Sequence, residues 1–258
     1  MRGMARTATA ALMAVGITVL AGVAVAAEGT ALKSHDWPFE GVFGRFDQAA
    51  LQRGYQVYRD VCSACHSVRF LTFRNLEGIG FGADRVKALA ATFEVEDGPN
   101  DEGDMFSRPG RPSDPLPKPF PNPQAARAAN GGALPPDLSL IAVAREGGPN
   151  YIFSILTGYQ DAPADFELTD GKNYNPYFPG HQIGMPEPLF DEAVDYADGT
   201  KATVDQMAGD VAQFLTWASE PKMVERKRIG IKVVLFLLVL TGLLYASKRK
   251  VWSKIKSH

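Results

Sequence analysis

The chain has 258 residues, of which 45% are hydrophobic and 22% are charged, and its formal net charge at neutral pH is only −2. That balance hides an asymmetry, because residues 28–220 hold fifteen Lys or Arg against twenty-eight Asp or Glu, a net charge of −13. A segment this acidic repels nucleic acid and attracts basic partners, although acidic charge also serves simply to keep a domain soluble. The sequence has only two cysteines, three positions apart, which excludes a disulfide-stabilised scaffold.

The first 27 residues have the pattern of a secretory signal peptide. Arg2 and Arg6 precede an apolar run over residues 8–21, and Ala24-Val25-Ala26 fits the small-x-small rule for cleavage. We therefore expect residues 1–27 to form the signal and the domain that follows to be exported. A second membrane helix is the alternative, but the run is short and ends in alanines.

A helix is predicted directly before the two cysteines. Asp47 is placed to cap a helix that runs to Cys62, with apolar residues recurring on one face. Gly54 lies in the middle of this helix and lowers its intrinsic stability. A glycine at such a position indicates a close crossing with another helix.

A second helix is predicted near the end of the acidic domain. Thr203 and Gln206 form a capping box at its start, and Pro221 ends it. Its apolar residues form one stripe: Val204, Met207, Val211, Phe214, Leu215 and Ala218. This stripe is the expected partner of the helix that contains Gly54.

The sequence between these two helices is rich in loops. Residues 98–136 contain ten of the eighteen prolines, a density that no long helix or central strand tolerates. Short helices are predicted at Pro123–Ala129, Asp137–Arg145 and Tyr151–Thr157. No stretch alternates apolar and polar residues as a half-buried strand does. The expected fold class is therefore mainly α, with long Pro-rich loop insertions.

An apolar run near the C-terminus predicts a membrane anchor. Residues 229–246 are interrupted only by Lys232, and these eighteen residues are enough for a helix to cross a bilayer. Basic residues precede the run at 226–228 and follow it in the tail, residues 247–258. Because the signal exports the N-terminal side, the positive-inside rule places the basic tail in the cytoplasm. The acidic domain, residues 28–220, is then in the periplasm, on a single-pass protein of a bacterial cytoplasmic membrane.

Cys62-Ser63-Ala64-Cys65-His66 has the spacing of a covalent attachment site for c-type haem. Two thiols three positions apart at a helix end lie on one face, where each can add to one haem vinyl group, and the histidine then lies under the iron as an axial ligand. A thioredoxin-type dithiol would not need His66 and usually follows a strand. A structural zinc site would need a fourth ligand that no cysteine can supply. The sequence thus predicts one haem c per chain, held by Cys62, Cys65 and His66.

The second axial ligand is predicted by elimination among the methionines and histidines. Met185 lies between a glycine and a proline in an extended loop with no competing structural task, so it is the preferred ligand. His181 is the rival, followed by His35 and Met105. Met207 lies on the apolar stripe of the second helix and suits the core instead.

These motifs belong to a wider resemblance. Five stretches resemble the cytochrome c1 family, the haem subunit of quinol–cytochrome c reductase: Gln56–Ser67, Gly131–Leu140, Tyr151–Tyr159, Asn175–Gly180 and Trp217–Pro221. The resemblance runs from about residue 35 to the C-terminus and implies a cytochrome c-like haem domain with one C-terminal transmembrane helix. It also implies that Met185 is the axial ligand and that Arg145 pairs with a haem propionate.

The resemblance implies an electron-transfer subunit that is not an enzyme on its own. Such a subunit accepts an electron from the Rieske iron–sulfur protein, in a complex with cytochrome b, and passes it to a basic cytochrome c in a respiratory or photosynthetic chain. Membrane lipid is the other expected partner. Two alternatives stay open: an independent membrane-anchored c-type cytochrome carrier, and a c-type haem peroxidase with an open sixth coordination position. The long Pro-rich insertion disfavours the carrier, and the availability of Met185 disfavours the peroxidase.

Overall fold

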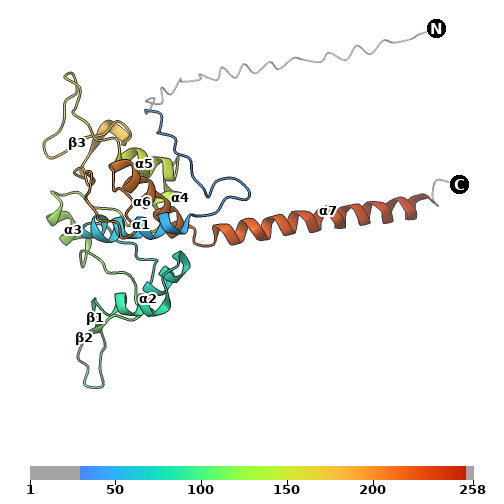
Figure 1. Ribbon diagram of the computed structural model, residues 1–258, viewed down its shortest axis with the longest axis horizontal. Coiled ribbons are helices and arrows are strands. Elements are labelled where there is room, and N and C mark those ends of the chain that lie inside the picture. The colour runs from blue at the N-terminus through green and yellow to red at the C-terminus, as the bar shows by residue number, and fades with distance from the viewer. Residues whose placement is uncertain (1–29, 254–258) are drawn as a thin grey trace, which may run out of the picture.

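The computed structural model describes residues 30–253, and Figure 1 shows a helical domain from which one long helix projects. The predicted signal peptide, residues 1–27, and residues 254–258 of the predicted basic tail lie outside the described residues. Helices dominate the described part, and the only strands in it are short. The mainly α fold class predicted from the sequence is confirmed.

Helix α1 (Gln48–Asp60) begins as the sequence predicts. The side chain of Asp47 accepts a hydrogen bond from the backbone N–H of Ala49, at 2.9 Å, and so satisfies one of the free donors of the first turn. The helix ends two residues before Cys62, where the chain tightens into a short 3-10 turn, η1 (Cys62–Ala64).

Helix α6 (Val204–Ser219) is the central helix of the domain. Thr203 caps it by accepting from the backbone N–H of Gln206 at 3.2 Å, but the side chain of Gln206 donates to Asp210 rather than back to the cap, so only half of the expected capping box forms. The predicted apolar stripe is buried except for Val204, which is half-buried. Much of the opposite face is buried too, because α1, α4 (Ile141–Ala144) and α5 (Pro149–Leu156) all pack against α6.

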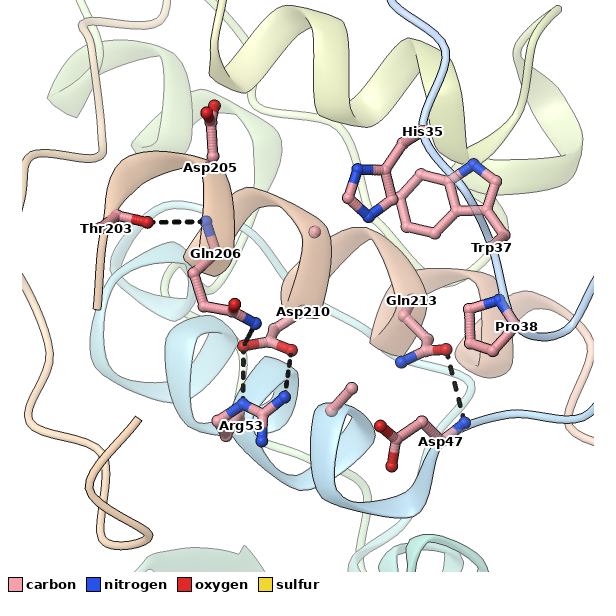
Figure 2. A pocket seen from close by; sticks show the side chains of 12 residues that line it. His35, Trp37, Pro38, Asp47, Arg53, Thr203, Asp205, Gln206, Asp210 and Gln213 are labelled. Carbon is pink, nitrogen blue, oxygen red and sulfur yellow. Dashed lines mark hydrogen bonds and ion pairs between the residues drawn. The ribbon is translucent and has the colours of Figure 1, made fainter. Parts of the chain in front are cut away.

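The crossing of α1 and α6 occurs at Gly54, as predicted. A Cβ atom added to Gly54 would lie 2.6 Å from the backbone carbon of Asp210 and 2.8 Å from the Cβ of Phe214, so only glycine permits this approach. Figure 2 shows the polar side of the crossing, where Arg53 holds the carboxylate of Asp210 through Nε at 2.9 Å and Nη2 at 3.0 Å. Asp210 is only 2% exposed, so its charge is buried at the crossing and is balanced there by Arg53.

The remaining helices differ from the sequence prediction mainly in length. Helix α3 (Pro123–Ala129) has the predicted bounds. Helix α4 is shorter than the predicted Asp137–Arg145, because Asp137 uses its side chain to bind the preceding part of the chain and does not enter the helix. Helix α5 begins at Pro149, two residues before the predicted start, since proline suits the first helical turn.

The structure contains several elements that the sequence does not predict. Three are helical: η2 (Phe73–Ile79), α2 (Ala83–Ala90) and η3 (Pro179–His181). The others are two antiparallel strand pairs, β1 (Glu94–Asp97) with β2 (Phe106–Pro109) and β3 (Asn173–Tyr174) with β4 (Gln182–Ile183). The β1–β2 hairpin lies within an extension at the lower end of the domain in Figure 1. Its strands are charged and largely exposed, so they carry no alternating apolar pattern from which to predict them.

Helix α7 (Met223–Ser253) contains the predicted span, residues 229–246, and extends beyond it at both ends. Its most apolar eighteen-residue window has a mean hydropathy of 2.3 and is entirely unburied, so this helix is long and apolar enough to cross a membrane. A short break at Pro221 separates α7 from α6. The C-terminal helix expected from the sequence is therefore present.

Candidate haem site

The two cysteines lie in a tight turn at the end of α1. The backbone N–H groups of Cys65 and His66 both donate to the carbonyl of Cys62, at 3.1 and 2.9 Å. Cys62 is half-buried and Cys65 is exposed, and both are free thiols. Burial raises the pKa of the Cys62 thiol to about 12, so this sulfur stays protonated at neutral pH. Because the turn follows a helix and not a strand, the thioredoxin-type alternative is disfavoured.

His66 is oriented as an imidazole ligand requires. Its Nδ1 lies 2.8 Å from the carbonyl oxygen of Pro136, which can only accept, so Nδ1 carries the hydrogen and Nε2 keeps a free lone pair. Burial lowers the pKa of His66 and favours the neutral ring, the form that binds iron. The hydroxyl of Tyr58 donates to the carbonyl of His66 at 3.1 Å and fixes the backbone there.

The segment that carries Pro136 is fastened to the residues after His66. The carboxylate of Asp137 accepts from the hydroxyl of Ser67 at 2.7 Å and from the backbone N–H of Arg69 at 3.0 Å. The hydroxyl of Ser139, a fully buried residue, accepts from the backbone N–H of Phe70 at 3.1 Å. Sequence reasoning noted this stretch only for its resemblance and missed these roles. The backbone N–H of Ser139 also donates to the carboxylate of Asp137 at 3.0 Å, a local bond that serine two residues after aspartate can signal; the longer-range contacts have no such signal.

Met185 lies in a loop that follows β4, half-buried against the core. Its carbonyl accepts from the hydroxyl of Tyr159 at 3.1 Å and from the amide of Asn173 at 3.2 Å, two residues that the sequence prediction did not single out. A Cβ added to the neighbouring Gly184 would lie 3.2 Å from the side chain of Ala133. The segment Gly131–Leu140 therefore contacts both the loop of Met185 and the ring of His66.

The other candidate ligands differ in their surroundings. His35 packs between Trp37 and Phe153, with ring centroids 4.4 and 4.8 Å away. The Nδ1 of His181 is 2.9 Å from the carbonyl of Pro176, which leaves its Nε2 free as in His66, so this contact does not exclude His181 as a ligand. Met105 and Met207 occupy opposite extremes: Met105 is 55% exposed beside β2, whereas Met207 is fully buried in α6, as predicted.

Arg145 ends α4 and is exposed to solvent. It lines a cleft of ≈ 770 Å³ together with Tyr151 and Tyr177. Within residues 30–253 no carboxylate forms an ion pair with it. Tyr177 belongs to the segment that leads into the loop of Met185, so the cleft that Arg145 lines borders that segment.

These side chains suit the iron of a haem better than a bare metal ion. Nowhere in the described part of the chain do three or more His, Cys, Asp or Glu side chains gather to hold a bare metal ion, which disfavours the zinc alternative. Two thiols, one oriented imidazole and one thioether are instead the groups that haem c uses. The helical fold and this donor set are those of a c-type cytochrome.

Comparison with known proteins identifies the family. A sequence model described as the Cytochrome C1 family matches residues 37–255. "Cytochrome c1" of Rhodospirillum rubrum is 49% identical over 264 aligned positions, covering 95% of this chain and 97% of that relative. "Cytochrome c1, heme protein, mitochondrial" of Schizosaccharomyces pombe is 53% identical, covering 89% of this chain and 75% of that relative. The chain belongs to the cytochrome c1 family. Its members carry covalently attached haem c, so the cofactor predicted from the sequence is confirmed.

Proposed function

We propose that Cys62 and Cys65 hold the haem through thioether bonds and that His66 and Met185 are its two axial ligands. The observation that carries this proposal is the shared contact of one segment with both ligand loops: Pro136 binds the ring of His66, and Ala133 lies against the glycine before Met185. One segment, Gly131–Leu140, thus contacts both ligand loops and helps to set the positions of both ligands.

Bound haem supplies a site that takes up and releases one electron at a time. The protein supplies the constraints on that site. The carbonyl of Pro136 fixes the tautomer and rotation of His66, and the two hydrogen bonds to the carbonyl of Met185 hold its loop closed. A thioether ligand raises the reduction potential relative to a second imidazole, and by occupying the sixth position it excludes the open site that peroxide chemistry needs.

We further propose that the chain is the haem subunit of a quinol–cytochrome c oxidoreductase and catalyses no reaction on its own. It accepts an electron from the Rieske iron–sulfur protein, in a complex with cytochrome b, and passes it to a basic cytochrome c. Similar proteins support this placement by their names: "Cytochrome b/c1" of Bradyrhizobium diazoefficiens, 48% identical, and "Cytochrome b-c1 complex catalytic subunit, mitochondrial" of Candida albicans, 52% identical. These names favour a complex subunit over an independent carrier or a peroxidase.

The proposed topology follows from the two ends of the chain. Residues 1–27 are the signal, residues 28–220 the periplasmic domain, residues 229–246 the membrane anchor and residues 247–258 the cytoplasmic tail. The unburied apolar surface of α7 supports the anchor. Anchoring keeps the domain at the surface of the cytoplasmic membrane, where donor and acceptor proteins are concentrated.

Arg145 is proposed to neutralise a haem propionate. Its exposed guanidinium lines an open cleft and has no carboxylate partner among the residues that the structure describes. Carboxylates bind well to guanidinium groups in such a position.

The complex is tested by purifying the affinity-tagged chain from membranes in mild detergent. We expect cytochrome b and the Rieske protein to copurify in fixed proportion, and the preparation to reduce cytochrome c with a quinol. A Cys62→Ala, Cys65→Ala double variant, which cannot attach haem, is the matched control and should lose the quinol-driven reaction. Recovery of the haem-loaded chain alone, with full reactivity toward cytochrome c, would favour the independent carrier instead.

A further inference from the structure

The loop Pro38–Arg45 presents two apolar side chains to the outside. Val42 is 62% exposed and Phe43 is 82% exposed, next to each other at the tip of the loop. Two adjacent large apolar side chains this exposed contribute little to packing within the domain and mark a candidate interaction site; the exposed charged residues beside them in the loop are Glu40 and Arg45.

The base of this loop is firmly held. Trp37 and Phe39 are buried, with 6% and 4% exposure, and their rings stack at a centroid distance of 5.5 Å. The backbone N–H of Arg45 donates to the carbonyl of Pro38 at 2.9 Å and closes the loop. Gly44 allows this closure, because a Cβ there would overlap the carbonyl of Glu40. The tip therefore projects from a fixed base.

The same loop is attached to the start of α7. The ammonium of Lys227 donates to the carbonyls of Phe39 and Gly41, at 2.5 and 2.7 Å. Lys227 stands only two residues before Ile229, where the apolar run begins, a rise of about 3 Å along the helix axis. In Figure 1 the loop, drawn in blue, lies on the side of the domain from which α7 leaves.

This position matches the headgroup layer of a bilayer. Each headgroup layer is roughly 5–7 Å thick, half the difference between the thickness of the whole bilayer and that of its hydrocarbon core. A loop level with Lys227 lies within that depth of the apolar run. Arg45 in the loop and Arg226 and Arg228 at the start of α7 are exposed, as are the acidic Glu40 and Glu225. Arg226 pairs with Glu220 at 2.7 Å, whereas Arg45 and Arg228 have charges that complement lipid phosphates. Apolar side chains flanked by Lys and Arg are typical of segments that bind the membrane surface.

We propose that Val42 and Phe43 insert into the phospholipid interface and give the domain a second contact with the membrane besides α7. The inference rests on the proposed membrane span, residues 229–246. Within this chain, α7 alone fixes where the domain leaves the membrane but not its tilt, which a second contact with lipid restricts. The loop thus sets the orientation of the haem site relative to the membrane plane.

The test uses a nitroxide probe on Phe43→Cys in the full-length, haem-loaded chain, reconstituted into nanodiscs of phosphatidylcholine and phosphatidylglycerol. Because the chain has only two cysteines and the haem uses both, the introduced thiol is the one that reacts. Paramagnetic resonance then compares collisions of the probe with oxygen, which concentrates in lipid, and with a water-soluble nickel complex. Met105→Cys, on the exposed hairpin side, and Leu235→Cys, on the apolar surface of α7, are the matched controls.

We expect the ratio of oxygen to nickel collisions at position 43 to be severalfold higher than at position 105 and lower than at position 235. A ratio at position 43 equal to that at position 105 places the tip in water and overturns the proposal. Protection from both reagents means that protein covers the tip, which also overturns it in favour of a partner subunit. A water-exposed probe at position 235 would show that residues 229–246 do not span the membrane. That result would overturn the proposed span, and this inference with it.

A second pair of variants tests the attachment of the loop to α7. Lys227→Ala removes both hydrogen bonds to the loop, so the probe at position 43 should become more mobile and its oxygen-to-nickel ratio should fall severalfold. Arg228→Ala removes the same charge one residue further along and should leave both readings unchanged. Equal effects of the two variants would mean that charge near the membrane, and not the attachment through Lys227, positions the loop.

Discussion

His66 shows how a single hydrogen bond prepares a side chain to bind iron. The Nδ1 hydrogen is committed to the carbonyl of Pro136, and burial keeps the ring neutral, so Nε2 is free before any haem arrives. The spacing of Cys62, Cys65 and His66 is local, which is why the sequence alone predicts this half of the site.

The other half of the site depends on residues far apart in the chain. Tyr159 and Asn173 hold the loop of Met185 through its carbonyl, and neither belongs to a recognisable motif. Elimination among the methionines can select Met185, because few others are free of a structural role. It cannot select the donors that fix its backbone, since those contacts arise only when the end of α5 and β3 come together.

Replacing Arg145 by alanine should lower the reduction potential of the haem. Loss of a nearby cation stabilises the oxidised, more positive haem through its unpaired propionate. Two charges 4 Å apart in water interact by about 1 kcal/mol, so a shift of tens of millivolts is expected at this exposed position. A redox titration of the purified protein measures it. Arg145→Lys keeps the charge and should restore most of the potential. Equal potentials in wild type and Arg145→Ala would mean that Arg145 is only a solvated residue at the end of α4 and does not pair with a propionate.

At the level of elements, the crossing of α1 and α6 is the most demanding contact in the domain. A methyl group on Gly54 would overlap the backbone of Asp210, which cannot move aside as a flexible side chain can. Gly54→Ala should therefore destabilise the domain by about 1–3 kcal/mol, the usual cost of overpacking. Thermal unfolding followed by circular dichroism measures the loss. Gly230→Ala in α7, where an added Cβ meets nothing within 4 Å, is the control and should leave the domain's transition unchanged.

The β1–β2 extension is held by ion pairs of Arg108, of which the one with Asp114 is bidentate. Asp114 accepts from both terminal nitrogens of Arg108, at 2.6 and 3.0 Å, and from the backbone N–H of Arg111 at 2.7 Å. The hydrogen bonds from Arg108 lower the pKa of Asp114 from 3.8 to about 2. A lowered carboxyl pKa stabilises the folded form at all pH values above the ordinary value. That stabilisation is lost as pH falls from about 4 toward about 2.

The expected result is a selective opening of the hairpin in this acid range. Hydrogen exchange of the β1 and β2 amides, corrected for the intrinsic rate, should lose protection there before α1 and α6 do. Asp114→Asn should expose the hairpin at neutral pH as well, whereas Asp101→Asn, in the same hairpin but without such a partner, should behave as wild type. Protection that persists unchanged through the acid range would show that Arg108 and Asp114 do not hold this element.

These elements also show where sequence reasoning stops. The caps at Asp47 and Thr203 and the glycine at the crossing are local or periodic signals, so α1, α6 and their contact are predictable. The hairpin is held instead by Arg108, which binds Asp97 across the strand pair and Asp114 beyond it. A hairpin held by ion pairs shows no alternation of apolar and polar residues in its sequence. The many prolines around it make a strand prediction there even less favoured. Helix α4 is shorter than predicted because tertiary contacts of Asp137 override its local preference.

Across the whole molecule, charge is the feature that bears on partners. The domain over residues 28–220 carries a net charge of −13, and one cluster of acidic residues follows the loop of Met185: Asp191, Glu192 and Asp195. The carboxylate of Asp191 also accepts from the backbone N–H of Val204 at 2.9 Å, a bond that an asparagine oxygen can replace. The cluster can therefore be neutralised without removing a support of α6.

Converting Asp191, Glu192 and Asp195 to their amides should slow electron transfer to a basic cytochrome c severalfold at low salt and flatten its salt dependence. Exposed charges are screened beyond about 8–10 Å at physiological ionic strength, so only charges near the docking site act. Stopped-flow salt series on both proteins give the comparison. The equivalent change of Glu96, Asp101 and Glu102, in the β1–β2 hairpin, is the matched control. Parallel curves for wild type and the first triple variant would move the docking site to that hairpin.

The assignment of the four haem residues is tested most directly by Met185→Leu, with Met105→Leu as the control. We predict that the variant keeps its haem through denaturing electrophoresis, because attachment needs only Cys62 and Cys65. Its iron should become high-spin, and its potential should fall by on the order of 100 mV or more, within the roughly 0.8 V range that axial ligation spans. A low-spin spectrum and an unchanged potential in Met185→Leu would contradict the assignment and make His181 the next candidate.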